Sequence, residues 1–207
     1  MTSTDRSRHS LGRMIPFPGS RAGQPPIARG WRLMMNSFQK GLGLGTLGTL
    51  LLIGAVALIV VLTGAYNIAA DDRHYPITEW ALDTSMTNSV ETRASNLNAP
   101  EFTQAMVEAG AGDYKAMCAH CHGGVGEGRA QWSSGMLPHP PALANAAKSW
   151  SDEEVFWLVK HGVKASGMPA FGGTHEDRAL WNITAFVKNM PQMSEERYAT
   201  LGSAGGH

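Results

Sequence analysis

The stretch Cys118-Ala119-His120-Cys121-His122 decides how the rest of this 207-residue chain is interpreted. It contains both cysteines of the chain, three positions apart, with a histidine directly after the second one. The C-x-x-C-H pattern is typical of covalent haem attachment, in which the two thiols add to the vinyl groups of the haem. The sequence therefore predicts one haem c bonded to Cys118 and Cys121, with His122 as an axial ligand of the iron.

The second axial ligand is expected in the segment Ser166–Gly172, where Met168 lies in a loop rich in glycine and proline. Histidine and methionine on opposite faces of the iron leave no coordination position for a substrate. Met136 lies in a similar loop, but only fourteen residues after His122. Most of that segment would have to be fully extended to reach the opposite face of the haem. We therefore expect Met168, not Met136, to bind the iron.

Other chemistries fit the cysteine pair less well. A thioredoxin-like C-x-x-C needs a surrounding strand–helix–strand pattern, and no alternating strand-like segment flanks this one. A zinc site needs a second pair of ligands, whereas His139, His161 and His175 are scattered singly. A five-coordinate haem sensor or peroxidase remains as an alternative and requires that Met168 does not bind the iron.

An uncharged apolar run precedes the haem motif. The thirty residues 41–70 contain no charged side chain, and about 20 apolar residues are enough to cross a bilayer. The apolar part of a cleavable signal peptide is about 7–15 residues long and follows a short basic leader. Here forty residues precede the run. We expect a transmembrane helix over residues 41–70 that is retained as a membrane anchor.

The charge of the chain is divided at this run. Residues 1–40 carry seven basic residues against one acidic residue, and residues 71–207 carry ten basic against sixteen acidic residues. Because basic segments are retained in the cytoplasm, we expect a single-pass protein of the bacterial inner membrane with its haem domain in the periplasm. The basic leader, residues 1–40, is expected to be disordered. Its arginines are spread singly, which favours attraction to lipid headgroups over binding of nucleic acid.

The helical spacing of apolar residues in the rest of the chain predicts an all-α fold. Residues 71–100 form a connector with an amphipathic helix over about 78–95, for packing on the haem domain, the membrane surface or a neighbouring subunit. The haem domain covers residues 101–201, and residues 202–207 form a flexible tail. Its three main helices are expected over about 102–117, after a capping box of Ser151 and Glu154, and from a cap at Thr174 to Met190-Pro191.

Residues 101–201 resemble a bacterial class I, single-haem cytochrome c, and the anchor with its connector resembles the membrane-bound subgroup. Gly110 and Tyr114 precede Cys118 by eight and four residues, as in the first helix of that family. The resemblance implies that this glycine and this aromatic residue cross the last helix, where Trp181 or Phe186 would be the partner. It also implies a small cytochrome c fold of three main helices around a covalently bound haem.

The resemblance extends to both faces of the haem. Met168-Pro169-Ala170-Phe171-Gly172 is similar to the loop that carries the distal ligand in the family. Pro140-Pro141-Ala142-Leu143 is similar to the segment that passes the proximal histidine. By this resemblance, the carbonyl of Pro141 accepts a hydrogen bond from His122, and Leu143 packs on the haem edge. The loop Gly135–His139 departs from the family pattern.

These features together predict an electron carrier and not an enzyme. Its expected partners are the membrane and redox proteins: a quinol-oxidising complex or a dehydrogenase as donor, and a terminal oxidase or reductase as acceptor. The alternative is a haem subunit fixed in a larger oxidoreductase complex. The acidic haem domain favours partners with a basic docking face, and no nucleic-acid partner is expected.

Overall fold

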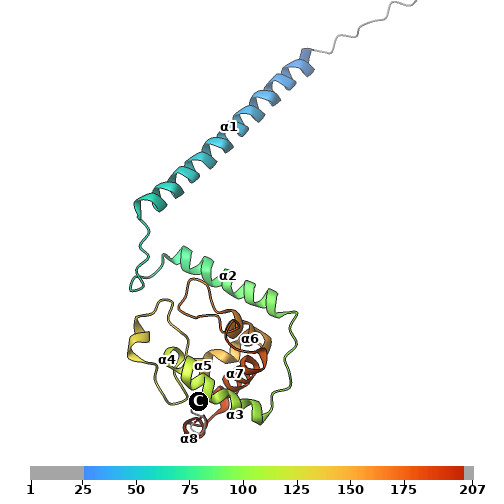
Figure 1. Cartoon of the computed structure of the whole chain (residues 1–207). Helices are drawn as coiled ribbons and strands as arrows, with labels where there is room; N and C mark the ends of the chain where they lie inside the picture. The colour runs from blue at the N-terminus through green and yellow to red at the C-terminus, as the bar shows by residue number, and fades with distance from the viewer. Residues whose placement is uncertain (1–25, 203–207) are drawn as a thin grey trace, which may run out of the picture. The chain divides into compact units, whose positions relative to one another are not determined.

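The computed structural model describes the backbone of residues 26–202 and the side chains of residues 34–202. In this part of the chain the regular secondary structure is entirely helical and includes no strand, as the sequence predicts (Figure 1). The chain divides into two compact units, with the boundary between Tyr66 and Asn67. Each unit is described by itself.

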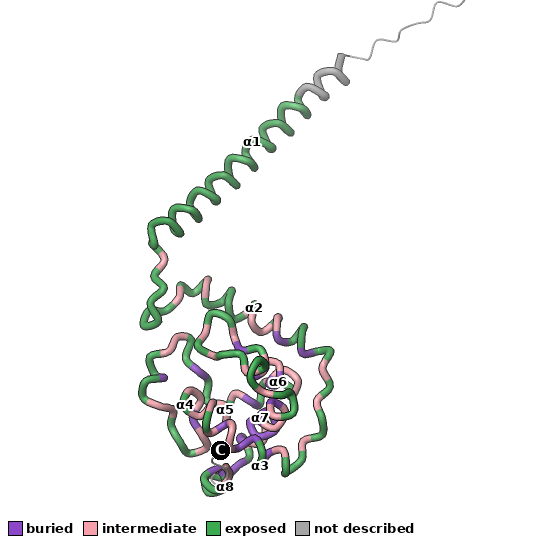
Figure 2. The backbone as a smooth tube through the Cα atoms, viewed as in Figure 1, coloured by how far each residue is buried: buried purple, intermediate pink, exposed green. Residues whose placement is uncertain are grey.

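The described part of the first unit is one long helix, α1 (Pro26–Thr63). Its segment Met34–Thr63 is long and apolar enough to cross a membrane, and an 18-residue stretch within it has a mean hydropathy of 2.5. The side chains of the segment are almost all exposed (Figure 2). The helix ends where Gly64 adopts a positive φ of 66°, a conformation that glycine favours at helix C-termini. This helix is compatible with a single-pass membrane anchor.

Both ends of α1 differ from the predicted boundaries of residues 41–70. The helix ends at Thr63 and already begins at Pro26, so it includes residues 26–40 of the predicted leader. Good helix formers such as arginine, leucine, methionine, glutamine and lysine occupy this stretch and allow the helix to extend toward the N-terminus. The rest of the predicted leader lies outside the described residues, as does the predicted tail except for Gly202.

The second unit contains eight elements of α- or π-helix within the described residues, together with short 3₁₀ turns. In chain order they are α2 (Pro76–Ala94), α3 (Gln104–Asp113), a π-helical turn (Tyr114–Cys118), α4 (Ala119–His122), α5 (Leu143–Ala146), α6 (Asp152–His161), α7 (Asp177–Asn189) and α8 (Glu195–Thr200).

Of the two predicted helix caps, the structure confirms one and contradicts the other. At α6 the predicted capping box is confirmed: the amide of Glu154 donates to the hydroxyl of Ser151 at 3.2 Å, and the amide of Ser151 donates to the carboxylate of Glu154 at 2.7 Å. The prediction that Thr174 caps the last main helix is wrong, because α7 begins only at Asp177. The hydroxyl of Thr174 instead donates to the carbonyl of Phe171 at 3.2 Å.

The core of the second unit is organised by the crossing of α3 and α7 (Figure 1). A Cβ atom built on Gly110 would lie 2.1 Å from the carbonyl oxygen of Asn182, so the two backbones approach too closely for any side chain at this position. One turn later, the ring of Tyr114 lies 5.1 Å from the ring of Phe186. Of the two predicted aromatic partners, Phe186 therefore contacts Tyr114, whereas Trp181 stacks on Phe156 with ring centroids 3.9 Å apart.

Replacing Gly110 by alanine is expected to destabilise the second unit by about 1–3 kcal/mol or more, because the methyl group would overlap the backbone of α7. Gly112→Ala is the matched control, since a Cβ atom there meets nothing within 4 Å. The control should change the free energy of unfolding by less than about 1 kcal/mol. Thermal and denaturant unfolding of both variants, followed by circular dichroism, checks this. Equal stability of the two variants would contradict the close crossing.

Candidate haem site

The haem motif lies where α3 passes into a wider turn and then into a short helix. Cys118 is the last residue of the π-helical turn, and Cys121 and His122 belong to α4. Both cysteines are free and half-buried. Residues three positions apart on a helical turn share one face, so the two thiols are presented together to a single group. Gly123 then ends α4 with a φ of 74°.

Hydrogen bonds to the backbone hold the motif from both sides. The buried hydroxyl of Tyr114 donates to the carbonyl of Gly123 at 2.7 Å and so joins the start of the π-helical turn to the end of α4. The amide of Ala130 donates to the carbonyl of His120 at 2.9 Å, which folds the following loop back onto α4. The position of the thiols therefore follows from the packing of α3 and not from the motif alone.

The ring of His122 is oriented by the loop before α5. Its Nδ1 atom lies 2.8 Å from the carbonyl oxygen of Pro141. A carbonyl oxygen only accepts hydrogen bonds, so Nδ1 carries the proton and Nε2 keeps a free lone pair for a metal. Burial lowers the pKa of His122, although the hydrogen bond to Pro141 opposes this effect. At neutral pH the ring is therefore held in the uncharged form that binds iron.

The thiol of Cys118 is also kept uncharged. Burial raises its pKa to about 12, and the nearby Asp113 and Cys121 act in the same direction. Cys118 thus faces the candidate site as a neutral thiol. Leu143, the first residue of α5, is half-buried and packs against the core.

The loop that carries Met168 is fastened to the C-terminal end of α6. The hydroxyl of Ser166 accepts the amide of Met168 at 3.1 Å and donates to the carbonyl of Val163 at 2.7 Å. The amide of Val163 donates to the carbonyl of Met168 at 3.2 Å. A Cβ atom on Gly162, whose φ is 64°, would lie 2.7 Å from that same carbonyl. The end of α6 therefore requires glycine there so that the methionine loop can fold across it.

The structure also brings the loop that carries Met136 next to the haem motif and to the loop of Met168. The Sδ atom of Met136 lies 3.9 Å from the Sγ atom of Cys121. The terminal methyl group of Met136 lies where a Cβ atom on Gly167 would be, at 2.1 Å. Met136 therefore touches both the haem motif and the neighbour of Met168. Residue spacing did not reveal this contact, because it joins two loops that are far apart in the sequence.

These groups fit a covalently attached haem. They offer two thiols on one face, a neutral imidazole with a free Nε2 atom, and thioether side chains on two adjoining loops. Several apolar side chains around them are only partly buried although they pack on the core, including Val125, Leu143 and Phe171. A zinc site fits less well, since no cluster of three or more His, Cys, Asp and Glu side chains occurs among the residues that the structure describes.

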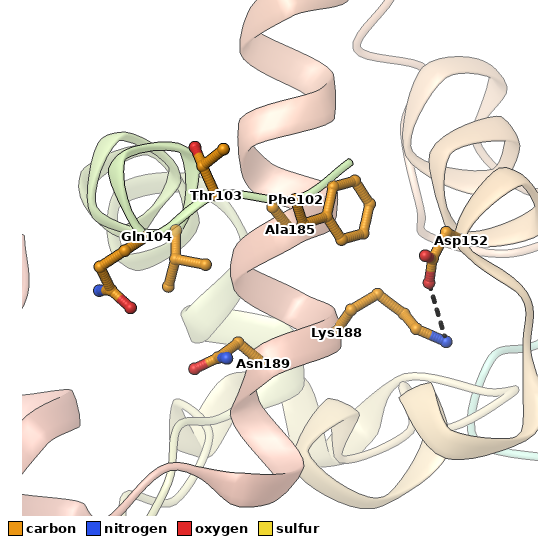
Figure 3. A pocket seen from close by; sticks show the side chains of 8 residues that line it. Phe102, Thr103, Gln104, Asp152, Ala185, Lys188 and Asn189 are labelled. Atoms are coloured by element: carbon orange, nitrogen blue, oxygen red, sulfur yellow. Dashed lines mark ion pairs between the residues drawn. The ribbon is translucent and has the colours of Figure 1, made fainter. Parts of the chain in front are cut away.

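A surface depression of about 330 Å³ lies elsewhere, between α3 and α7 (Figure 3). None of the predicted site residues lines it. Lys188, one of its charged residues, has its Nζ atom 3.3 Å from Asp152 and donates to the carbonyl of Ala147 at 3.1 Å. These groups connect α7 to α6 and to the turn before it, so their role here is structural.

The part of the chain that contains the motif matches a known protein family. Residues 105–187 match the family model described as cytochrome c oxidase, cbb3-type, subunit III. The matched range begins in α3, contains the C-x-x-C-H motif and the loop of Met168, and ends in α7. No curated protein matches the chain at a significant level. Domains of this kind bind haem c covalently and transfer electrons. Residues 105–187 therefore form a c-type cytochrome domain.

Proposed function

We propose that this protein is a membrane-anchored cytochrome that carries single electrons through one haem c ligated by His122 and Met168. The observation that carries this proposal is the C-x-x-C-H motif at the π-helical turn and α4, with the His122 Nδ1 atom 2.8 Å from Pro141, inside a domain that matches a cytochrome family. The haem supplies an iron that changes its charge by one electron. The work of the protein is to hold that iron rigidly and to keep water from it.

Each proposed ligand is held by backbone contacts that do not depend on the charge of the iron. His122 is oriented by a carbonyl group, and the loop of Met168 is fastened to α6 through Val163 and Ser166. Electron transfer is favoured when the ligands move little between the two charge states. Methionine sulfur also raises the reduction potential relative to a second histidine.

The contacts of Met136 support Met168 as the distal ligand. The vinyl groups that bond to the cysteines lie at the periphery of the haem. A thioether in contact with the Cys121 sulfur, as that of Met136 is, therefore lies near the haem edge and away from the iron. The proposed role of Met136 is to cover this edge and to pack against Gly167.

The proposed place of the protein is the bacterial inner membrane, with the haem domain in the periplasm. The uncharged segment of α1 and the opposite charges on its two sides support this topology. There it would accept electrons from a quinol-oxidising complex or a dehydrogenase and pass them to a terminal oxidase or reductase. The alternative is a fixed haem subunit of an oxidoreductase, which the description of the matched family favours. The two differ in whether mild detergent extracts the protein alone or with constant partners.

If both thiols bond the haem, the denatured protein should keep its haem on a gel, and its pyridine haemochrome should show the c-type band. Cys118→Ser and Cys121→Ser should each leave one bond and shift the band toward that of free haem. The double variant should lose covalent haem. His120→Ala changes a residue between the cysteines and is the control that should leave the band unchanged. Release of haem from the unaltered protein by acidic acetone would contradict the attachment.

If Met168 is the distal ligand, Met168→Ala should abolish the weak charge-transfer absorption near the red end of the ferric spectrum, which reports an iron–sulfur bond. The iron should then bind added imidazole readily. Met136→Ala is the matched control, because it removes the neighbouring thioether but should leave the absorption in place. The opposite pattern in the two variants would assign the ligand to Met136.

If the haem domain is periplasmic, alkaline phosphatase fused after Leu201 should be active, because this enzyme needs the oxidising periplasm. A fusion after Lys40, before the uncharged segment, should be inactive. Reversed activities would reverse the topology. Sequencing of the mature N-terminus completes the test, since a chain that began near Asp71 would have lost its anchor.

A further inference from the structure

The two halves of α2 have different surroundings. In the C-terminal half, Val90 and Ala94 are buried, and the helix packs on α6. In the N-terminal half, the large apolar side chains of Ile77 and Trp80 are 68% and 63% exposed, and the tube in Figure 2 changes accordingly from purple and pink to mostly green. The sequence predicts one amphipathic helix over about 78–95. The structure buries only the later part of it.

The exposed apolar residues lie on a separate side of the helix. Each residue of an α-helix turns by about 100° around the axis, so Ile77, Trp80 and Ala81 share one side. That side is roughly a third of a turn away from Val90 and Ala94. The helix can therefore pack on the haem domain with one side while the other contacts something else.

The acidic residues of the N-terminal half of α2 also have a defined position around the helix axis. Glu79 and Asp83 are exposed. By the same rotation, Glu79 lies about 100° or more from the side formed by Ile77 and Trp80, whereas Asp83 borders that side. The N-terminal half of α2 thus has an apolar side and a charged side that both reach solvent. This amphipathic arrangement fits a boundary between an apolar and an aqueous phase.

The surface of the bilayer that α1 is proposed to span is such a boundary, and α2 follows α1 closely in the sequence. Twelve residues lie between Thr63, the end of the proposed membrane span, and Pro76 at the start of α2, and even a fully extended connection reaches at most about 45 Å. The connection is not fully extended, since the side-chain amide of Asn67 donates a hydrogen bond to the carboxylate of Asp72 at 2.9 Å. It also continues the exposed apolar character, with Ile68 90% exposed.

We propose that the side of α2 formed by Ile77, Trp80 and Ala81 lies in the headgroup layer of the lipid bilayer that α1 spans. This inference rests on the membrane anchoring in the proposed function. Tryptophan is enriched at the membrane–water interface because its ring is apolar and its N–H group remains hydrated. A second attachment at α2 would hold the haem domain beside the bilayer instead of leaving it on a free tether. Electron exchange would then occur within a narrow layer above the membrane.

The test uses the full-length haem-loaded protein, one copy in each phosphatidylcholine nanodisc. In that protein both native cysteines are bonded to haem, so a single introduced cysteine takes a nitroxide spin label specifically. The labelled variants are Ile77→Cys and Trp80→Cys on the apolar side, with Glu79→Cys as the matched control in the same turn. Leu50→Cys reports the membrane span.

Collisions of the label with oxygen and with a water-soluble nickel chelate identify what covers each position. Lipid concentrates oxygen and excludes the chelate, whereas contact with protein reduces both. The oxygen-to-nickel ratio at positions 77 and 80 should exceed that at 79 at least threefold and approach the ratio at position 50. Equal ratios at 77, 79 and 80 would overturn the proposal, and so would low collision rates with both reagents, which indicate a protein cover. A low ratio at position 50 would instead show that the anchor itself is wrong.

Discussion

The close crossing of α3 and α7 at Gly110 is the contact on which the geometry of the haem site depends. With no side chain at this position, the α3 backbone can lie against the carbonyl of Asn182, and Tyr114 is then packed against Phe186. The hydroxyl of Tyr114 reaches from there to the carbonyl of Gly123 behind the motif. A glycine eight residues before Cys118 thus determines where the haem would be attached.

The proposed ligands come from two separate parts of the domain, and each is held by a different kind of contact. His122 belongs to the continuation of α3 and is oriented by one carbonyl group that also fixes its tautomer. Met168 belongs to a loop folded on the end of α6, at a glycine that permits close backbone approach. The haem would join these two parts. Because its attachment is covalent, it would also add apolar contacts to a core that is small for a domain of this length.

A membrane anchor limits where an electron carrier can meet its partners. A tethered domain samples a thin layer above the bilayer, so its effective concentration near membrane enzymes is set by the length of the connection. The structure shortens that connection, since α2 is packed on α6 and forms part of the unit that contains the C-x-x-C-H motif. The connection between the two helices is therefore limited to the residues between Thr63 and Pro76. In the proposed function, this short reach favours redox partners that are embedded in the same membrane.

The sequence by itself determined the features that depend on neighbouring residues. The C-x-x-C-H motif, the uncharged run and the capping box at Ser151 are local patterns, and short-range chemistry is enough to interpret them. Only the tertiary structure decided the features that depend on distant residues. It made Phe186 and not Trp181 the partner of Tyr114, and it brought Met136 to Gly167. It also divided α2 into a buried and an exposed half, because burial is decided by which surface of another element lies opposite a residue, and periodicity along one helix does not contain that information.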